Sequence, residues 1–265
     1  MDYLFDAWER IKDKLEEKYL FIFLDFDGTL TPIVETPDKV KLSVKTKILL
    51  EELVSSPKIK LAFISGRAIG DIKDKIGLKN AIYSGNHGLE IEGPKIKFES
   101  QVSSQIKPIM RKIALDLGKR LSGIKGVLIE NKGPTLSVHY RLVSEKDISV
   151  LEEILSESIS PYFRDNKINV NSGKKVFEIV PPVKWDKGKV VLWLLARQQF
   201  LLGEKNVFPV YIGDDVTDEN AFKALKRKGV TILVGGSSSS KADYYLNNSK
   251  EVVHFLKLIA DLKHN

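Results

Sequence analysis

The chain has 265 residues, of which 43% are hydrophobic and 29% are charged, as is typical of a folded globular protein with a sizeable core. It contains no cysteine, which excludes disulfides, thiolate metal sites and cysteine nucleophiles. The formal net charge is +7, but lysines and acids are interleaved along the whole length, so charged helix faces explain the excess better than a nucleic-acid partner does.

Two elements are predicted ahead of the first polar motif. Residues 2–17 carry apolar side chains at helical spacing, which indicates an amphipathic helix. Tyr19 to Leu24 is an unbroken apolar and aromatic run, which predicts a strand buried on both faces. Asp25 and Asp27 therefore stand where a buried strand ends, and that edge of an open α/β sheet is where ligands bind.

This pair of carboxylates carries the first functional signal. At roughly 4 to 6 Å apart the two charges repel each other, so they require a cation, a shared proton or open water. Gly28 lets the chain turn sharply behind them, and Thr29 brings a hydroxyl to the same place. The pair suits nucleophilic and acid–base roles around a divalent metal, and a solvated turn is the alternative.

The segment that follows alternates helices, strands and polar loops. Ser43 is predicted to cap a helix whose core face carries Val44, Ile48, Leu49 and Val54. Strands are expected at 60–64 and 81–84, with a helix at 68–76 between them. Polar residues stand at both strand ends: Ser65 and Arg67 after the first, Asn86 and His87 after the second.

Residues 102–181 follow a different pattern. Two helices, at 105–121 and 144–158, alternate with two pairs of strands, at 127–130, 135–142, 167–170 and 176–180. This αββαββ order predicts a small α+β domain with an antiparallel sheet. The dipeptide Pro181-Pro182 marks the end of this predicted domain.

The first pattern then returns. A helix at 187–199 begins with Lys187, and a buried strand at 208–212 leads to Asp214 and Asp215. A helix, a strand and a last helix are expected at 217–227, 230–234 and 250–262. Residues 1–101 and 182–265 are therefore predicted to form one α/β domain with a Rossmann-like, doubly wound parallel sheet, and residues 102–181 an inserted cap.

The polar residues of the α/β domain form a constellation if their strands are neighbours. Carboxylates from two strands can hold Mg²⁺, and a hydroxyl, an ammonium and turn amides can bind phosphate oxygens. Each residue also has a structural interpretation: a turn for Ser65, a surface position for Lys187 and a helix cap for Asp214 and Asp215. Together they indicate a phosphoryl-transfer site.

The motifs resemble those of a known superfamily. Asp25-Phe26-Asp27-Gly28-Thr29-Leu30, Ser65, Lys187 and Gly213-Asp214-Asp215 are similar to the four motifs of the haloacid dehalogenase-like (HAD) phosphatases. The resemblance implies that Asp25 is the nucleophile and Asp27 the general acid and base, and that Ser65 and Lys187 bind the phosphoryl group. It also implies Mg²⁺ held by Asp25, the main-chain carbonyl of Asp27 and Asp214. Thr29, Asp215 and Asp218 would orient these ligands without binding the metal themselves.

Further segments resemble the trehalose-6-phosphate phosphatases within that superfamily. These are Gly213 to Glu219, Ser65 to Arg67, Gly85 to Gly88, Glu130 to Lys132, His139 to Arg141, Gly173-Lys174 with Glu178, and Trp185 to Gly188. The resemblance implies a Mg²⁺-dependent hydrolysis of trehalose 6-phosphate. It assigns the substrate contacts to Arg67, Asn86 and His87 in the core and to Glu130, Lys132, His139, Arg141, Lys174 and Glu178 in the cap.

Alternatives remain for this assignment. The cap residues would otherwise form salt bridges on a solvated sheet face, and Val180 departs from the Arg or Lys that many members carry there. Sucrose phosphate and mannosyl- or glucosyl-3-phosphoglycerate are handled by neighbouring families with the same core. A phosphorylated receiver domain is less consistent, because Asp27 would activate water and erase the signal, and a sugar phosphomutase usually carries its cap elsewhere.

The partners follow from the same features. We expect a small sugar phosphate as the ligand, with no nucleic acid and no membrane. No apolar run reaches the ~18 residues of a membrane span, and the first 18 residues lack the apolar stretch of a signal peptide. The sequence therefore predicts a cytoplasmic protein, and we expect a monomer.

Overall fold

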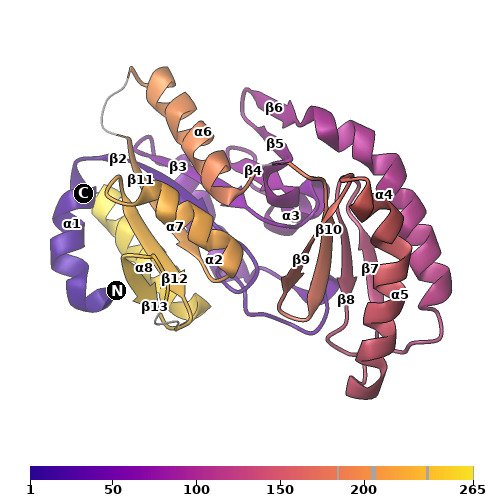
Figure 1. Ribbon diagram of the computed structural model, residues 1–265. Coiled ribbons are helices and arrows are strands. Elements are labelled where there is room, and N and C mark those ends of the chain that lie inside the picture. Colours follow the sequence, from indigo (N-terminus) through magenta and orange to yellow (C-terminus); the bar gives the residue numbers. More distant parts are fainter. Residues whose placement is uncertain (184, 204–206, 237–238, 265) are drawn as a thin grey trace. The chain divides into compact units, whose positions relative to one another are not determined.

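The larger part of the chain is built on a nine-stranded sheet (Figure 1), in a computed structural model that describes residues 1–183, 185–203, 207–236 and 239–264. The strand order is β1-β13-β12-β11-β2-β3-β4-β5-β6, and the pairs from β1 to β4 in this order are parallel. The strands are β1 (Asp2–Tyr3), β2 (Tyr19–Leu24), β3 (Ile59–Ile64), β4 (Ile82–Gly85), β5 (Glu90–Gly93), β6 (Ile96–Glu99), β11 (Val207–Gly213), β12 (Val230–Val234) and β13 (Tyr244–Leu246).

The predicted strand β2 lies in the middle of this sheet. It pairs with β11 on one side and β3 on the other, and Leu20 to Leu24 are completely buried. Because both neighbours are parallel to β2, Asp25, Ser65 and Asp214 all follow strands that end at the same edge of the sheet. The doubly wound α/β fold is confirmed.

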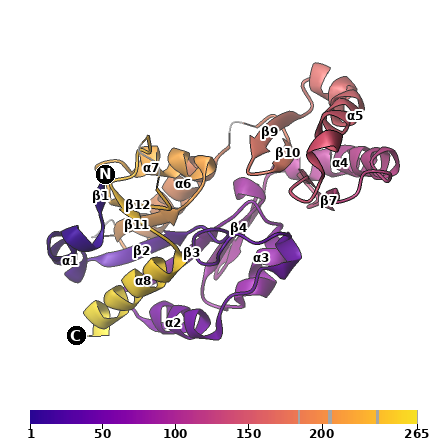
Figure 2. The ribbon, with the colours of Figure 1, turned by 90° about the horizontal axis from the view of Figure 1, so that it is seen from below.

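Helices cover both faces of the sheet (Figure 2). The helices α2, α3 and α8 lie on one face, and α6 and α7 lie on the other. Their bounds are α1 (Trp8–Glu16), α2 (Val44–Ser55), α3 (Ile69–Ile76), α6 (Lys187–Leu201), α7 (Glu219–Leu225) and α8 (Ser249–His264). The described residues of this part also form four short 3-10 helices: η1 (Phe5–Ala7), η2 (Pro37–Lys39), η3 (Asn86–Gly88) and η4 (Val216–Asp218).

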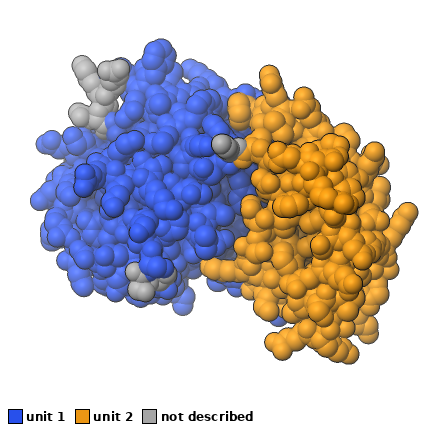
Figure 3. All heavy atoms as spheres, in the orientation of Figure 1, with its two compact units in different colours: residues 1–97, 185–265 blue, residues 98–184 orange. Residues whose placement is uncertain are grey.

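The chain divides into two compact units (Figure 3). Unit 1 contains residues 1–97 and 185–265, and unit 2 contains residues 98–184. Unit 2 thus begins at residue 98 where the sequence suggested 102, and ends at 184 where it suggested 181. The role of unit 2 as a cap stays a prediction.

Unit 2 is a two-layer α+β structure. Its antiparallel sheet has the order β7-β8-β10-β9, and two helices pack against one face of it. The elements follow one another as αββαββ: α4 (Gln101–Arg120), β7 (Leu128–Asn131), β8 (Leu136–His139), α5 (Glu145–Arg164), β9 (Asn169–Gly173) and β10 (Val176–Val180). Alternate residues of β8, Leu136 and Val138, are buried under the helices, so Ser137 and His139 belong to the opposite face.

Two predictions about helices are wrong in detail. Val44 and Ile48 of α2 are 75% and 58% exposed, and the buried residues are Thr46, Leu49, Leu50 and Leu53. Apolar residues occur around most of this helix, so their spacing alone does not select the inner face. The predicted cap is confirmed, because Ser43 Oγ accepts a hydrogen bond from the amide of Thr46 at 3.0 Å.

The first helix also starts later than expected. Asp2 and Tyr3 form the edge strand β1, which pairs with β13, and the α-helix begins only at Trp8. The backbone amide of Leu4 donates to the carbonyl of Tyr245 at 3.1 Å. Pairing with a strand from the far end of the chain therefore overrides the local helical pattern.

Candidate active site

The predicted nucleophile and the predicted phosphate-binding lysine are in direct contact. Lys187 Nζ donates to Asp25 Oδ1 at 2.7 Å, and the two side chains are 3% and 8% exposed. Lys187 is the first residue of α6, where Asp186 caps the helix by accepting from the amide of Lys189. The surface position that Lys187 could have had is therefore excluded.

A second buried carboxylate completes this ion network. Lys187 Nζ also donates to Asp218 Oδ1 at 2.7 Å, and Asp218 is completely buried. Burial raises the pKa of Asp25 well above its ordinary value, although the charge of Lys187 opposes this shift. Burial alone would lower the pKa of Lys187, but Asp218 and Asp25 together raise it well above its ordinary value, so the ammonium stays charged.

Asp218 also shapes the loop that carries Asp214. Its Oδ2 accepts from the amides of Asp214 at 3.1 Å and Asp215 at 2.9 Å. A Cβ at position 213 would collide with the Asp218 carboxylate, so only glycine fits at Gly213. Asp215 accepts from the amide of Val216 at 2.6 Å and caps η4, as its structural interpretation suggested.

The arrangement of carboxylates fits a bound cation. Oxygen atoms of Asp25, Asp214 and Asp218 lie within 4.8 Å of one another. Gly28 has a φ of 86°, and a Cβ there would collide with the carboxylate of Asp214, so the glycine brings the two strand ends together. Such a group of carboxylate oxygens is the kind of ligand set that a divalent cation such as Mg²⁺ prefers.

Asp27 is held by Arg67. The guanidinium donates from Nε to Asp27 Oδ2 at 2.6 Å and from Nη2 to Asp27 Oδ1 at 2.7 Å. Its remaining nitrogen donates to Asp71 at 2.6 Å, and Nη2 also donates to the carbonyl of Pro37 at 3.0 Å. The Arg67 side chain is only 7% exposed, whereas Asp27 is 40% exposed.

The loop after β4 wraps around the loop after β3. The amides of Asn86 and His87 donate to the carbonyls of Arg67 and Ser65, at 2.8 and 3.1 Å. Both residues have positive φ, 50° and 56°, a conformation that non-glycine residues adopt rarely. Asn86 is completely buried and its side chain donates to Glu90 at 2.6 Å, so it organises the loop.

Two buried hydroxyl groups lie in the loops that follow β2 and β3. Ser65 is 2% exposed, and its Oγ accepts from the amide of Arg67 at 3.1 Å. Thr29 is completely buried, and among the residues that the structure describes its Oγ1 has no hydrogen-bond partner. Ser65 Oγ therefore keeps a proton that it can donate.

Unit 2 has a polar cluster of its own on the sheet face opposite its helices. His139 Nε2 lies 3.0 Å from Glu130 Oε2, and Lys132 Nζ lies 3.4 Å from Glu178 Oε1. Glu130 pairs with Ser137 across β7 and β8, and Ser137 pairs with Glu178 across β8 and β10. The cluster is thus a continuous row across three strands.

Three of the predicted cap residues lie outside the strands, and Lys132 is the first of them, directly after β7. Arg141 follows the end of β8, and Lys174 lies in the turn between β9 and β10, where its carbonyl accepts from Arg141 Nη2 at 2.9 Å. Residues two or four apart in one strand share a face, so the sequence spacing predicts that Arg141 points with His139, and Lys174 with Glu178. This prediction is wrong, because Arg141 and Lys174 are not strand residues. The strand β8 ends at His139, three residues before its predicted end at 142, whereas β10 spans 176–180 as predicted.

Sequence reasoning missed three residues at these sites. Tyr211 donates to Asp218 at 2.6 Å, Asp71 binds Arg67, and Ser137 lies in the unit 2 cluster. Tyr211 gave no signal because it stands inside an apolar strand. Asp71 could have been found from its i,i+4 spacing to Arg67, and Ser137 from its position two residues before His139.

Comparisons with known proteins first define a class. A haloacid dehalogenase-like hydrolase from Bacteroides thetaiotaomicron matches with a TM-score of 0.63 and 18% identity, over 91% of this chain and 100% of that one. At this identity the match concerns the fold, which is that of the HAD-like hydrolases. In this chain Asp25 follows β2 and Asp214 follows β11.

A closer family follows from the sequence. The model of the family described as trehalose-phosphatase matches residues 23–250. A probable trehalose-phosphate phosphatase of Oryza sativa subsp. japonica is 36% identical over 262 residues, which cover 97% of this chain and 70% of that protein. The C-terminal domain of the Candida albicans trehalose-6-phosphate phosphatase matches with a TM-score of 0.81 and 25% identity, over 96% of both chains. The chain belongs to the trehalose-phosphatase family and is a phosphoric monoester hydrolase.

One further observation concerns membranes. Within the described ranges, no helix combines the length and the apolar character needed to cross a bilayer.

Proposed function

We propose that the protein hydrolyses trehalose 6-phosphate to trehalose and phosphate through an aspartyl-phosphate at Asp25. The observation that carries this proposal is the contact between Asp25 Oδ1 and Lys187 Nζ at 2.7 Å, at the end of the central strand. A buried carboxylate beside a fixed ammonium can attack an anionic ester that the ammonium partly neutralises. The family and the names of its relatives support the choice of substrate.

The chain's own residues would divide the reaction into two steps. In the first, Asp25 attacks phosphorus, the bond to the sugar oxygen breaks, and Asp27 gives that oxygen a proton. In the second, Asp27 takes a proton from water, which attacks phosphorus and releases Asp25 and inorganic phosphate. Ser65 and Lys187 would donate to the phosphoryl oxygens throughout.

Mg²⁺ fits the acidic cluster. Asp25, Asp214 and the main-chain carbonyl of Asp27 would hold it. When bound, it would offset the repulsion between the anionic nucleophile and the anionic phosphate. Asp218 is less suited as a ligand, because Lys187, Tyr211 and two backbone amides already donate to its two oxygens.

Arg67 has a different role in this proposal from the substrate contact predicted from sequence. Its nitrogens bind Asp27, Asp71 and the carbonyl of Pro37, which leaves little of the guanidinium for a sugar. Arg67 would instead hold the Asp27 carboxylate in one orientation near the reacting oxygen. His87 is partly exposed and remains a proposed substrate contact.

The sugar would be selected by the polar row of unit 2. Glu130, Lys132, His139 and Glu178 offer paired acceptors and donors, which a site for a disaccharide needs. Arg141 and Lys174 lie next to this row and would bind the sugar from the adjoining turns. The competing proposal is another sugar phosphate: sucrose phosphate, or mannosyl- or glucosyl-3-phosphoglycerate.

A phosphate-release screen tests the proposal. The protein is assayed with Mg²⁺ on trehalose 6-phosphate and on each competing sugar phosphate. The highest kcat/KM is expected with trehalose 6-phosphate. A higher kcat/KM with another sugar phosphate would contradict the assignment of the substrate but not the proposed phosphatase reaction. Phosphate release from none of them would contradict both the substrate and the reaction.

A further inference from the structure

Tyr211 is a buried polar residue that the proposed reaction does not use. It stands in β11, three residues before Asp214, and its side chain is completely buried. Its hydroxyl donates to Asp218 Oδ1 at 2.6 Å, and burial raises its pKa well above its ordinary value. The phenol is therefore a neutral hydrogen-bond donor at the back of the acidic cluster.

The hydrogen bond joins Tyr211 to the reacting groups through one carboxylate. Asp218 Oδ1 accepts from Tyr211 and from Lys187, and the same ammonium donates to Asp25. The other oxygen of Asp218 accepts from the amides of Asp214 and Asp215. The orientation of this carboxylate therefore determines where the ammonium lies and how the loop carrying Asp214 is held.

The aromatic ring of Tyr211 is fixed by its neighbours. It is stacked on Phe23 with 6.4 Å between the ring centroids, and Phe222 meets it edge-on at 5.8 Å. Tyr211 and Phe23 are partners in the register of β11 and β2, and Phe23 lies two residues before Asp25. The hydroxyl thus comes from β11, and β11 and its neighbour β2 are the strands that lead to Asp214 and Asp25. The ring that bears it is packed on two sides and has little freedom to rotate.

We propose that Tyr211 is a positioning residue for phosphoryl transfer: its hydroxyl fixes the Asp218 carboxylate, and through it Lys187 and the loop of Asp214. This inference rests on the proposed function of Asp25. Tyr211 touches neither substrate nor metal in this scheme. Without the hydroxyl the carboxylate loses one of the four donors that define its orientation.

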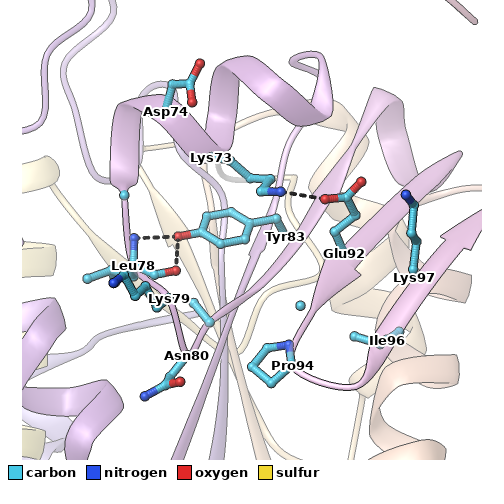
Figure 4. Close-up of a pocket in the computed structure, with 13 residues that line it drawn as sticks. Lys73, Asp74, Leu78, Lys79, Asn80, Tyr83, Glu92, Pro94, Ile96 and Lys97 are labelled. Carbon is cyan, nitrogen blue, oxygen red and sulfur yellow. Dashed lines mark hydrogen bonds and ion pairs between the residues drawn. The ribbon is translucent and has the colours of Figure 1, made fainter.

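The chain offers a matched control in a second buried tyrosine (Figure 4). Tyr83 of β4 is 3% exposed, and its hydroxyl donates to the carbonyl of Leu78 at 2.7 Å and accepts from the Leu78 amide at 2.8 Å. It lines a cavity of about 690 Å³ between α3 and the β5–β6 hairpin, and none of the predicted site residues line that cavity. A Tyr→Phe change at either position removes one buried hydroxyl and keeps the ring.

The experiment compares Tyr211→Phe with Tyr83→Phe on 4-nitrophenyl phosphate at saturating Mg²⁺. Tyr211→Phe is expected to lower kcat about 10- to 100-fold, the range for a hydrogen bond to a charged group, with KM unchanged. Tyr83→Phe is expected to keep the wild-type kcat. Thermal unfolding should show a similar loss of Tm in both variants, which separates positioning from general destabilisation.

A double-mutant cycle tests the route through Asp218. In the Asp218→Asn background, removing the Tyr211 hydroxyl should change kcat little, because the carboxylate that it positions is gone. An unchanged kcat in Tyr211→Phe would overturn the inference. So would an equal loss of kcat when the Tyr211 hydroxyl is removed from the wild type and from Asp218→Asn. Asp25→Asn is measured alongside: if it keeps activity, the proposed function fails, whatever Tyr211 does.

Discussion

Arg67 donates to both carboxylate oxygens of Asp27, at 2.6 and 2.7 Å, and the third nitrogen of its guanidinium donates to Asp71 at 2.6 Å. Such a two-point ion pair fixes the plane of the carboxylate as well as its distance. Arg67, which follows β3, is thus bound to the carboxylate of Asp27, which follows β2. If Asp27 transfers protons, its orientation depends on Arg67.

The first prediction concerns Arg67→Gln. Because 4-nitrophenolate leaves readily without a proton and phenolate does not, the variant should lose more kcat/KM on phenyl phosphate than on 4-nitrophenyl phosphate. A loss of about 100-fold on phenyl phosphate is expected, at the lower end of what proton transfer contributes. Neither substrate has a sugar, so the comparison is independent of sugar binding.

The control for this prediction is Arg197→Gln. Arg197 donates to the carbonyl of Lys95 and lies outside the acidic cluster. Arg197→Gln should keep the wild-type kcat/KM on both phenyl phosphate and 4-nitrophenyl phosphate. An equal factor on the two aryl phosphates in Arg67→Gln would show that Arg67 acts on something other than the proton of the leaving group.

The second prediction concerns the metal. Chelation should abolish activity and Mg²⁺ should restore it. Asp214→Asn should weaken Mg²⁺ binding, measured by calorimetry, more than Asp218→Asn does. The loss in Asp218→Asn should stay within roughly the 10- to 100-fold typical of groups that orient ligands, because its oxygens bind Lys187, Tyr211 and backbone amides. Equal losses in the two variants would contradict this ranking.

The third prediction concerns substrate choice by unit 2. Glu130→Ala and Glu178→Ala should each lower kcat/KM on trehalose 6-phosphate about 10- to 100-fold, the equivalent of one hydrogen bond to a charged group. Activity on 4-nitrophenyl phosphate should be unchanged, since it has no sugar. Glu153, an exposed residue of α5, provides the control Glu153→Ala. A proportional loss on both substrates would mean that the two glutamates support the fold instead.

The fourth prediction concerns stability. Lys263 of α8 is 9% exposed, and its Nζ donates to the carbonyls of Leu15, Glu16 and Lys18 at 2.6, 2.7 and 2.6 Å. It thereby caps the end of α1 from the last helix of the chain. Lys263→Met should lower the free energy of unfolding by roughly 1–3 kcal/mol, because the carbonyls lose a charged donor.

Urea unfolding measures this effect, with Lys257→Met as the control. Lys257 is exposed on the same helix. If the two variants unfold at the same urea concentration, the capping role of Lys263 is wrong.

Much of the fold could be predicted because its central strands are buried on both faces. The run Tyr19 to Leu24 is β2, and Val230 to Val234 is β12. The strands missed are short and lie toward the edges of the sheet, such as β13 and β5, where three or four residues give no clear pattern. They exist because a neighbouring strand pairs with them.

The site could be predicted to the level of residue types at strand ends. That Asp25, Ser65 and Asp214 come together follows from parallel neighbours in one sheet, whereas Lys187 comes from the first turn of α6. The particular partners could not be predicted, because a contact such as Arg67 to Asp27 depends on side-chain directions across two loops. Tyr211 is the extreme case, since a strand position cannot reveal which carboxylate its hydroxyl will meet.

The most direct test of the account is the capture of the covalent intermediate. The reaction with trehalose 6-phosphate and Mg²⁺ is quenched in acid during turnover, and the peptides are mapped by mass spectrometry. We expect one phosphoryl group on Asp25, and none in Asp25→Asn, which should also lose turnover while keeping its fold. Turnover with no phosphoryl group at Asp25, or with the group on another residue, would contradict the account.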